Sequence, residues 1–318
     1  MNSVAAILNS LVLYRYSLIL ALAGAAGICF FMACCSHAQI PVFQASMAAF
    51  LAVALSLPLA RLFYWYGRPD RFPSLFQAIT SPDTEAFALS GAMAGCILAA
   101  FLSGRQKKML DCMCIAGCGA IALGRLGCFF TETDRGQIMV RLTSFPWAYP
   151  VTNVSGQLEY RFATFAFQAA VAAALGIFLA VLFFRKKPRS GDTTILFLLF
   201  YSASQVILDS TRYDSLYLRS NGFVSMVQVF SAAALVSVLV FLCIRTAKRL
   251  GWKAWMIPLR ISLTVLFALT GYMEYYVQRH GREAAFAYSI MGSCLAALVG
   301  LGLLLWHLSR KSEENMVS

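Results

Sequence analysis

Hydrophobic residues in this chain are grouped into long runs, which short polar segments separate. Runs of about 20 apolar residues have the length that a helix needs to cross the hydrocarbon core of a bilayer. The pattern therefore predicts an all-α, polytopic membrane protein of about nine transmembrane helices, of which the sixth is the shortest. The predicted spans are 15–35, 42–65, 86–104, 109–130, 162–184, 193–209, 223–244, 254–276 and 285–308.

The composition agrees with this interpretation. Of the 318 residues, 60% are hydrophobic and only 13% are charged. A soluble domain could not bury so much apolar surface, whereas a lipid bilayer solvates it. The net charge of +12 would suggest a nucleic-acid partner in a soluble protein. Here most basic residues lie in short loops between the runs, where they indicate topology, so we expect the lipid bilayer as the surroundings and no nucleic-acid partner.

The loops predict the orientation of the chain. Those that follow the third, fifth, seventh and ninth runs are almost purely basic, which is typical of the cytoplasmic side. The N-terminus is therefore expected outside and the C-terminus in the cytoplasm. The opposite loops have mixed charges, and Pro146 and Pro150 in the longest, 131–161, predict a structured cover rather than a helix. The basic loops carry Arg105, Lys107 and Lys108; Arg185, Lys186, Lys187 and Arg189; Arg245, Lys248, Arg249 and Lys253; and Arg310 and Lys311.

The cysteines do not indicate a metal site. Most of the 10 cysteines lie inside apolar runs, where cysteine packs as a small apolar residue. Cys112, Cys114 and Cys118 lack the paired CxxC spacing of a zinc site, and none of the 3 histidines is near them. We expect neither a metal nor a cofactor.

Arg125 is the most informative interruption of the apolar pattern. It lies between Gly124 and Gly127 near the end of the fourth run. It follows Asp111 by about four helical turns, roughly 21 Å, which places it in the outer half of the bilayer. A guanidinium at membrane depth costs roughly 3 kcal/mol on insertion scales, so it normally faces a wet cavity or an anionic partner. The alternative is an arginine that extends to the membrane interface.

Other spans bring polar side chains to the same layer. Tyr16 and Arg61 lie at the outer ends of the first two runs, Arg212 follows the sixth, and Gln228 opens the seventh. Three arginines without matching carboxylates require an anion, and a lipid phosphate is the obvious one at this depth. Polar side chains from several spans at one depth favour a binding site over an arginine that only extends to the membrane interface.

The order and spacing of these residues resemble the prolipoprotein diacylglyceryl transferase family, which begins lipoprotein maturation in the bacterial inner membrane. The resemblance covers about residues 13–245 and includes a seven-helix layout. It divides the chain into a transferase-like membrane domain, 1–250, and a C-terminal extension with two further helices, 251–318. The matching segments are 13–18, 60–64, 124–127 with Phe129 and Gly136, 145–148, 209–212 and 225–228.

The resemblance implies a reaction and a site. The diacylglyceryl group of phosphatidylglycerol is transferred to the thiol of a lipobox cysteine, and glycerol phosphate is released. Arg125, Arg212 and Tyr16 are the implied catalytic residues, and Arg125, Arg212, Gln228 and Arg61 are implied to bind phosphatidylglycerol. Arg61 is also expected to brace the helices. The implied partners are phosphatidylglycerol and the signal peptides of preprolipoproteins, in a multi-pass protein of the bacterial plasma membrane.

Several positions differ from the family pattern. Ser90 stands where the family has a histidine, which is the natural candidate for a base. Cys128 and Thr131 replace asparagines, and the signature glutamate maps near Thr133, next to Glu132. These differences keep two alternatives open: a transferase with reduced activity, and a non-catalytic protein that binds anionic lipid or lipobox peptides. A small-anion transporter is the third class, but the sequence has no inverted repeat and no helix interrupted at mid-membrane depth.

Overall fold

The structure is a computed structural model, and it describes residues 14–81, 86–153, 155–186, 188–218, 224–279 and 284–317. This part of the chain contains eight helices that are long and apolar enough to cross a membrane. The prediction of an all-α, polytopic membrane protein is confirmed, while the orientation of the termini stays a prediction. The long helices are α2 (Arg15–His37), α3 (Val42–Gly67), α6 (Gln106–Gly127), α7 (Thr164–Lys186), α8 (Asp192–Ser210), α9 (Met226–Leu250), α10 (Met256–Arg279) and α11 (Ala284–Val317).

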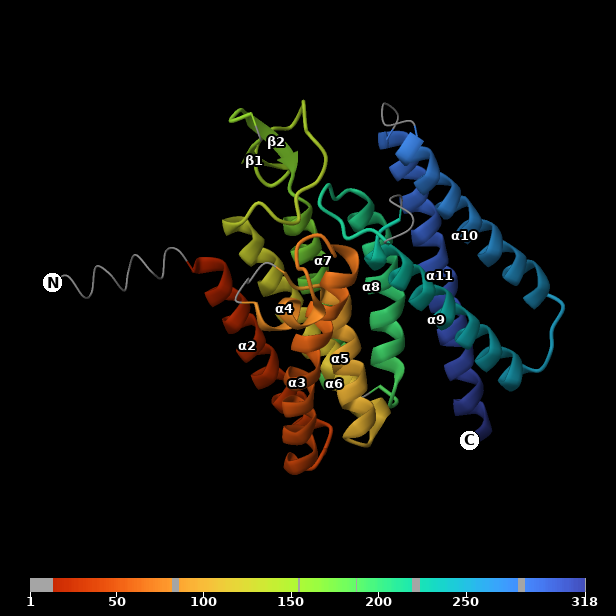
Figure 1. Cartoon of the computed structure of the whole chain (residues 1–318). Coiled ribbons are helices and arrows are strands. Elements are labelled where there is room, and N and C mark those ends of the chain that lie inside the picture. Colours follow the sequence, from red (N-terminus) through yellow and green to blue (C-terminus); the bar gives the residue numbers. More distant parts are fainter. Residues whose placement is uncertain are drawn as a thin grey trace. The chain divides into compact units, whose positions relative to one another are not determined.

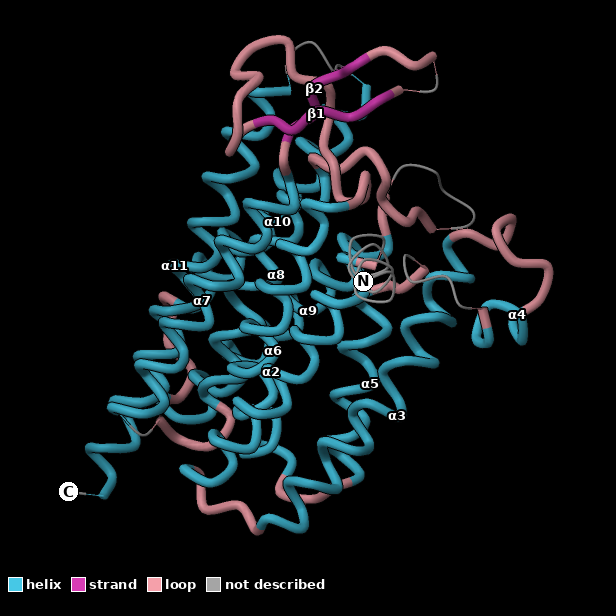
Figure 2. The backbone as a smooth tube through the Cα atoms, turned by 90° about the vertical axis from the view of Figure 1, so that its left-hand side faces the viewer, coloured by secondary structure: helices cyan, strands magenta, loops and turns pink. Residues whose placement is uncertain are grey.

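The third predicted span is shorter than expected. Helix α5 covers Leu89–Leu102, which is 14 residues, or roughly 21 Å. Residues 86–88 are not helical, with Ala88 extended, and a turn at Gly104, with a φ of 78°, follows the helix. Helix α5 packs against α3 (Figure 2). Gly91 is in such close contact with α3 that a Cβ atom there would overlap the carbonyl group of Leu59.

The chain forms two compact units. The first comprises the described residues of 1–197 and 211–226, and the second comprises those of 198–210 and 227–318. In the first unit, α6 packs against both α2 and α7, and α3 pairs with α5 (Figure 1). In the second unit, α10 packs along α11.

The long segment between α6 and α7 is structured, as predicted. It begins with the 3-10 turn η1 (Cys128–Phe130) and contains two antiparallel strands, β1 (Ala148–Thr152) and β2 (Leu158–Phe162). Ala148 is paired with Phe162 in this hairpin. Both views show the hairpin beyond the N-terminal end of α7 (Figures 1 and 2). The prediction that this segment is structured and not a helix of spanning length is therefore confirmed for the described residues, whereas the two strands were not predicted and the covering role stays a prediction.

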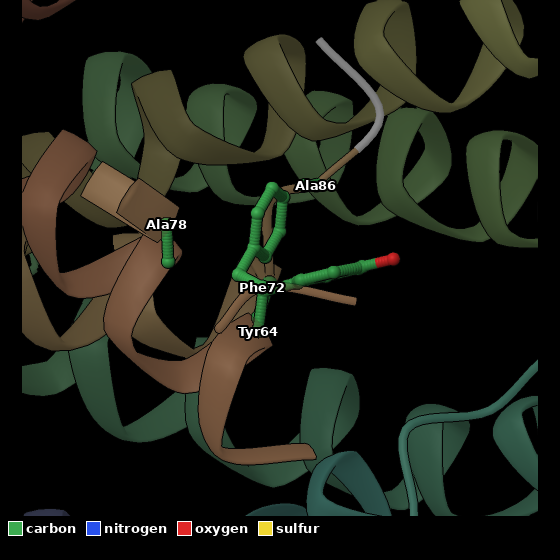
Figure 3. Packing of buried hydrophobic residues seen from close by; sticks show 5 residues of the cluster. Tyr64, Phe72, Ala78 and Ala86 are labelled. Atoms are coloured by element: carbon green, nitrogen blue, oxygen red, sulfur yellow. The ribbon is translucent and has the colours of Figure 1, made fainter. Parts of the chain in front are cut away.

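The segment between α3 and α5 also has its own small core. It includes the short helix α4 (Leu75–Thr80). Arg71 donates a hydrogen bond to the Tyr64 hydroxyl at 2.6 Å, and the Trp65 indole donates one to the Phe72 carbonyl at 3.3 Å. This packing fixes the backbone on either side of the C-terminal end of α3. The buried cluster consists of Tyr64, Phe72, Ala78, Ala86 and Ala88 (Figure 3).

Asp111 of α6 stabilises the start of α8. Its carboxylate accepts hydrogen bonds from the backbone N–H of Gly191 at 2.6 Å and of Thr194 at 2.8 Å, and from the Thr194 hydroxyl at 2.7 Å. The first N–H groups of a helix have no partner within the helix. Asp111 therefore acts as the N-terminal cap of α8 from a neighbouring helix.

Replacing Asp111 with alanine is expected to lower the free energy of unfolding by about 1–3 kcal/mol, because buried N–H groups lose their acceptor. The measurement is the thermal unfolding midpoint of the detergent-solubilised protein. The matched control is Asp70→Ala, which removes an exposed aspartate and is expected to leave the midpoint unchanged. Equal midpoints for the Asp111 variant and the wild type would contradict the capping role.

Candidate functional site

One carboxylate, that of Asp134, lies between two arginines that are far apart in the sequence. It forms ion pairs with Arg125, near the end of α6, and with Arg212, which follows α8; the second pair measures 2.6 Å. The side chains of all three residues are no more than 10% exposed. The two arginines that the sequence assigned to one site therefore do meet, and they meet at a shared acidic residue.

A second carboxylate completes this group. One oxygen of Asp214 lies 3.2 Å from the Arg212 guanidinium, and the other accepts the backbone N–H of Asp134 at 2.8 Å. We call Arg125, Asp134, Arg212 and Asp214 the arginine–aspartate cluster. Its formal charges balance, so the prediction that the arginines lack matching carboxylates is wrong for Arg125 and Arg212. The sequence shows that the acidic residues lie in mixed-charge loops, but it does not show how those loops contact one another.

The backbone around Asp134 brings the two loops together. Asp134 has a φ of 57°, a left-handed conformation that aspartate adopts more readily than most residues. Gly136 forms an isolated antiparallel bridge with Arg212, and the Tyr213 N–H donates to the Arg135 carbonyl at 2.8 Å. A Cβ atom at Gly136 would come within 2.9 Å of the Thr211 carbonyl oxygen, so only glycine allows this approach. The position of Asp134 thus depends on local conformation as much as on charge.

The electrostatics of the cluster keep Asp134 ionised. Burial by itself raises the pKa of this carboxyl group, but Arg125 and Arg212 outweigh it and hold the pKa well below its ordinary value. The Cys128 thiol also donates a hydrogen bond to Asp134 at 3.2 Å. An aspartate with such a lowered pKa is a poor proton acceptor near neutral pH.

Arg135 braces the same turn from the other side. Its guanidinium lies 4.2 Å from the Tyr149 ring centroid and 4.3 Å from that of Phe165. It donates hydrogen bonds to the carbonyl groups of Cys128 at 2.9 Å and Thr131 at 2.6 Å. Burial lowers the pKa of Arg135. Sequence reasoning did not single out Arg135, because its neighbours come from the hairpin and from the start of α7.

Tyr16 lies next to this region. It is half-buried and packs against the buried cluster of Cys128, Ala163 and Phe165. Cys128 is also the residue whose thiol contacts Asp134. Tyr16 therefore packs against the same small core that contains Cys128, and its predicted role in the site stays a prediction.

Arg61 and Gln228 have other surroundings. Arg61 donates a hydrogen bond to the Ser81 carbonyl at 3.0 Å, and its guanidinium lies 4.0 Å from the Phe87 ring centroid. These contacts join the C-terminal end of α3 to the segment before α5, and the predicted bracing of the helices by Arg61 stays a prediction. Gln228 belongs to the second compact unit, where its amide donates to the Val206 carbonyl at 3.4 Å. This contact favours helix packing for Gln228, and lipid binding by either residue stays a prediction.

The structure shows the surroundings of two positions that differ from the family pattern. Ser90 is half-buried in the first turn of α5, and its hydroxyl oxygen has no hydrogen-bond partner among the described residues. Of the acidic residues on either side of Thr133, Glu132 is exposed, while Asp134 faces the arginines. The carboxylate that belongs to the site is therefore Asp134, one residue after the position that the resemblance indicated.

Comparison with known proteins identifies the family. A sequence profile described as prolipoprotein diacylglyceryl transferase matches residues 3–244 of the chain. The chain belongs to this family. The prolipoprotein diacylglyceryl transferase profile ends before α10 begins, and the division of the chain at residue 250 stays a prediction.

Curated relatives carry the same family name at low identity. The phosphatidylglycerol–prolipoprotein diacylglyceryl transferase of Acaryochloris marina is 26% identical over 221 residues, which cover 66% of this chain and 79% of the relative. The transferase of the same name from Thermotoga maritima is 26% identical over 212 residues, which cover 63% of this chain and 70% of the relative. The resemblance stated from the motifs is thus confirmed at the level of the family.

Proposed function

We propose that this protein transfers the diacylglyceryl group of phosphatidylglycerol to the lipobox cysteine of preprolipoproteins in the bacterial plasma membrane. Membership of the family supports the chemistry. The observation that carries the proposal is that Arg125 and Arg212 meet at Asp134. Both arginines belong to the segment that matches the family, but they are far apart in the sequence. Guanidinium groups are the preferred ligands of phosphate, because their planar set of N–H donors matches its oxygens.

In this proposal, the arginines hold the phosphate of the lipid headgroup. Each guanidinium has five N–H donors, more than the carboxylates of Asp134 and Asp214 require. The thiolate sulfur attacks the diacylglyceryl carbon that carries the phosphate oxygen. A C–S bond forms, the C–O bond breaks, and glycerol phosphate leaves with the bonding electron pair. Arg125 and Arg212 stabilise the charge that develops on this leaving group.

The other predicted residues have supporting roles. Tyr16 donates a hydrogen bond to the headgroup or to the sulfur nucleophile. Arg61 keeps the C-terminal end of α3 in place and adds positive charge for the headgroup.

The thiol proton leaves before the attack. Ser90 cannot remove it, because an alcohol is not a base near neutral pH. Asp134 is a poor acceptor, since its pKa is lowered. A cysteine thiol has an ordinary pKa of about 8.5, so a few per cent of it is thiolate at pH 7 without any base.

The alternative function is binding at the same site without catalysis. A pair of arginines binds a phosphate without any base, so the same residues suit a protein that binds anionic lipid or lipobox peptides. Ser90 at the histidine position is the observation that favours this alternative. It differs from the transferase in one measurable respect, which is the absence of a thioether product.

The test is transfer in a reconstituted system. The purified protein is placed in vesicles that contain phosphatidylglycerol and is given a synthetic lipobox peptide. We expect a peptide mass increased by one diacylglyceryl group, with release of an equal amount of glycerol phosphate. A peptide with serine in place of the acceptor cysteine is the control and is expected to stay unmodified. Binding of phosphatidylglycerol without any transfer would support the binding alternative.

A further inference from the structure

The turn between α9 and α10 carries positive charge that the proposed transfer reaction does not use. Residues 243–260 include five basic residues and no acidic one. The turn joins two helices that are long and apolar enough to cross a membrane (Figure 1), so we expect it at a bilayer surface. All five basic residues follow the last residue that matches the family profile. They are Arg245, Lys248, Arg249, Lys253 and Arg260.

Arg260, near the start of α10, is held by contacts rather than extended into water. Its guanidinium lies 4.6 Å from the centroid of the Trp252 ring. It is also within hydrogen-bonding reach of the Cys243 side chain of α9. Arg260 is half-buried, and among the described residues no carboxylate pairs with it. Contacts from α9, from the turn and from α10 therefore meet at one positive charge.

These contacts leave Arg260 suited to bind a phosphate group. A guanidinium that lies over an aromatic ring uses its face for that contact and keeps N–H donors along its edge. Such donors match the oxygens of a phosphate. Trp252 is 63% exposed, and tryptophan at a bilayer surface prefers the level of the lipid headgroups. Lys248, in the last turn of α9, and Lys253, in the turn itself, are exposed and add positive charge.

The end of α9 from which the turn starts is attached to α11. The Arg249 guanidinium donates a hydrogen bond to the Ser309 carbonyl, and the Thr246 hydroxyl donates one to the Leu305 carbonyl at 3.3 Å. Both acceptors belong to α11, and Ser309 is buried. All of these residues lie in the second compact unit. The basic turn is therefore anchored within its own unit.

We propose that the α9–α10 turn binds the phosphate of an anionic membrane phospholipid, with Arg260 as the main donor and Lys248 and Lys253 as flanking charges. The lipid lies in the leaflet at which α9 ends. A zwitterionic phospholipid has the same phosphate, but its own positive charge cancels the attraction, so the basic turn selects anionic lipids. This site shares no residue with the arginine–aspartate cluster, and it does not depend on the proposed transfer reaction.

Arg279, at the other end of α10, provides a matched control. Its guanidinium lies 5.7 Å from the Tyr275 ring centroid, so it is also an arginine over an aromatic ring of the same unit. It is exposed, and the nearby Glu274 supplies a negative charge that the basic turn lacks. If Arg260 only extends to the membrane interface, Arg260→Gln and Arg279→Gln should have equal effects on lipid binding. The proposed site predicts an effect for Arg260→Gln alone.

The experiment uses the full-length protein in phosphatidylcholine vesicles that contain a trace of photoreactive phosphatidylglycerol or, separately, of photoreactive phosphatidylcholine. After illumination and digestion, mass spectrometry quantifies the lipid attached to peptides from 243–260. We expect at least about fivefold more labelling by phosphatidylglycerol than by phosphatidylcholine. Arg260→Gln is expected to lower the phosphatidylglycerol labelling about fivefold, the size expected for one basic residue near an anionic surface. Arg279→Gln is expected to leave it unchanged.

A second variant guards against loss of the fold. Lys253→Gln changes an exposed side chain, and it is expected to lower phosphatidylglycerol labelling of the same peptides without changing the phosphatidylcholine labelling. Equal labelling by the two lipids, or unchanged labelling in both Arg260→Gln and Lys253→Gln, would overturn the proposal. Loss of the phosphatidylglycerol label on addition of millimolar inorganic phosphate would identify a soluble anion as the ligand and would also overturn it.

The failure of this proposal is distinguishable from the failure of the proposed function. The labelled peptides are identified, so lipid bound at the basic turn is counted separately from lipid bound at the arginine–aspartate cluster. Selective labelling of 243–260 in a protein without transferase activity would support the lipid site and contradict the proposed function. Transfer activity without selective labelling of these peptides would do the reverse.

Discussion

Replacing Asp134 with asparagine is expected to lower the free energy of unfolding by about 3–5 kcal/mol, the usual effect of removing one member of a buried ion pair. The substitution removes the negative charge that Arg125 and Arg212 share in a largely buried setting. Asparagine is the appropriate replacement, because it has nearly the same shape. It also tolerates the left-handed backbone conformation of this residue, whose φ is 57°. The loss is then attributable to charge rather than to backbone strain.

The measurement is the thermal unfolding midpoint in detergent, which is expected to fall by about 10 °C. Glu132→Gln is the matched control, since it removes the same charge from an exposed side chain two residues earlier. Its midpoint is expected to stay within a degree or two of the wild type, as for other exposed charges. Equal decreases in the two variants would show that Asp134 has no special partnership with the arginines.

The ion pairs of Asp134 also predict how the stability of the protein depends on pH. The folded protein lowers the pKa of Asp134 from its ordinary value of 3.8. The stability contributed by the ionised carboxylate is therefore complete above that value, and it is lost progressively as the pH falls below it. We expect the wild type and Asp134→Asn to differ by a constant amount between pH 7 and pH 5 and to converge below about pH 4. A difference that grows at lower pH would contradict the ion pair.

The rate of diacylglyceryl transfer is expected to rise about 20-fold between pH 7 and pH 9, if the protein acts as proposed. The reason is that the substrate thiol, with a pKa of about 8.5, must ionise without help. Neither acidic neighbour of Thr133 supplies a base: Glu132 is exposed, and Asp134 has a lowered pKa and contacts two arginines. The measurement is the initial rate of transfer to a lipobox peptide across this pH range. A rate that is already maximal at pH 7 would contradict the proposal that the thiol ionises unaided.

Replacing Ser90 with histidine is expected to raise the rate at pH 7 by at least about tenfold and to flatten the pH profile, because imidazole is a general base with a pKa of about 6.5. The Ser90 hydroxyl makes no hydrogen bond to any described residue, so the substitution removes no hydrogen bond of that group. Ser90→Asn is the matched control, which adds a polar side chain of similar size without a titratable group. An equal rate increase in both variants would indicate that size, not basicity, is responsible.

The hydrophobic pattern by itself was sufficient to predict the class of this protein and most of its helices. Spanning helices are predictable because their length is set by the bilayer and their backbone hydrogen bonds are internal. The same reasoning placed Arg125 and Arg212 near one depth, since both lie at the outer ends of predicted spans. It failed for the length of α5, where the turn at Gly104 and the non-helical residues 86–88 shorten the helix to 14 residues.

The partners of the arginines were decided only by the tertiary structure. Asp134 and Asp214 lie in different loops, 80 residues apart, and many other charges share those loops. Their meeting depends on the left-handed turn at Asp134 and on the close approach that Gly136 permits. The contact of Arg249 with Ser309 is similar, because it joins two helices that no local pattern relates. Residue types and their spacing determine which segments are spanning helices and which are loops. Long-range backbone contacts determine which charges neutralise one another.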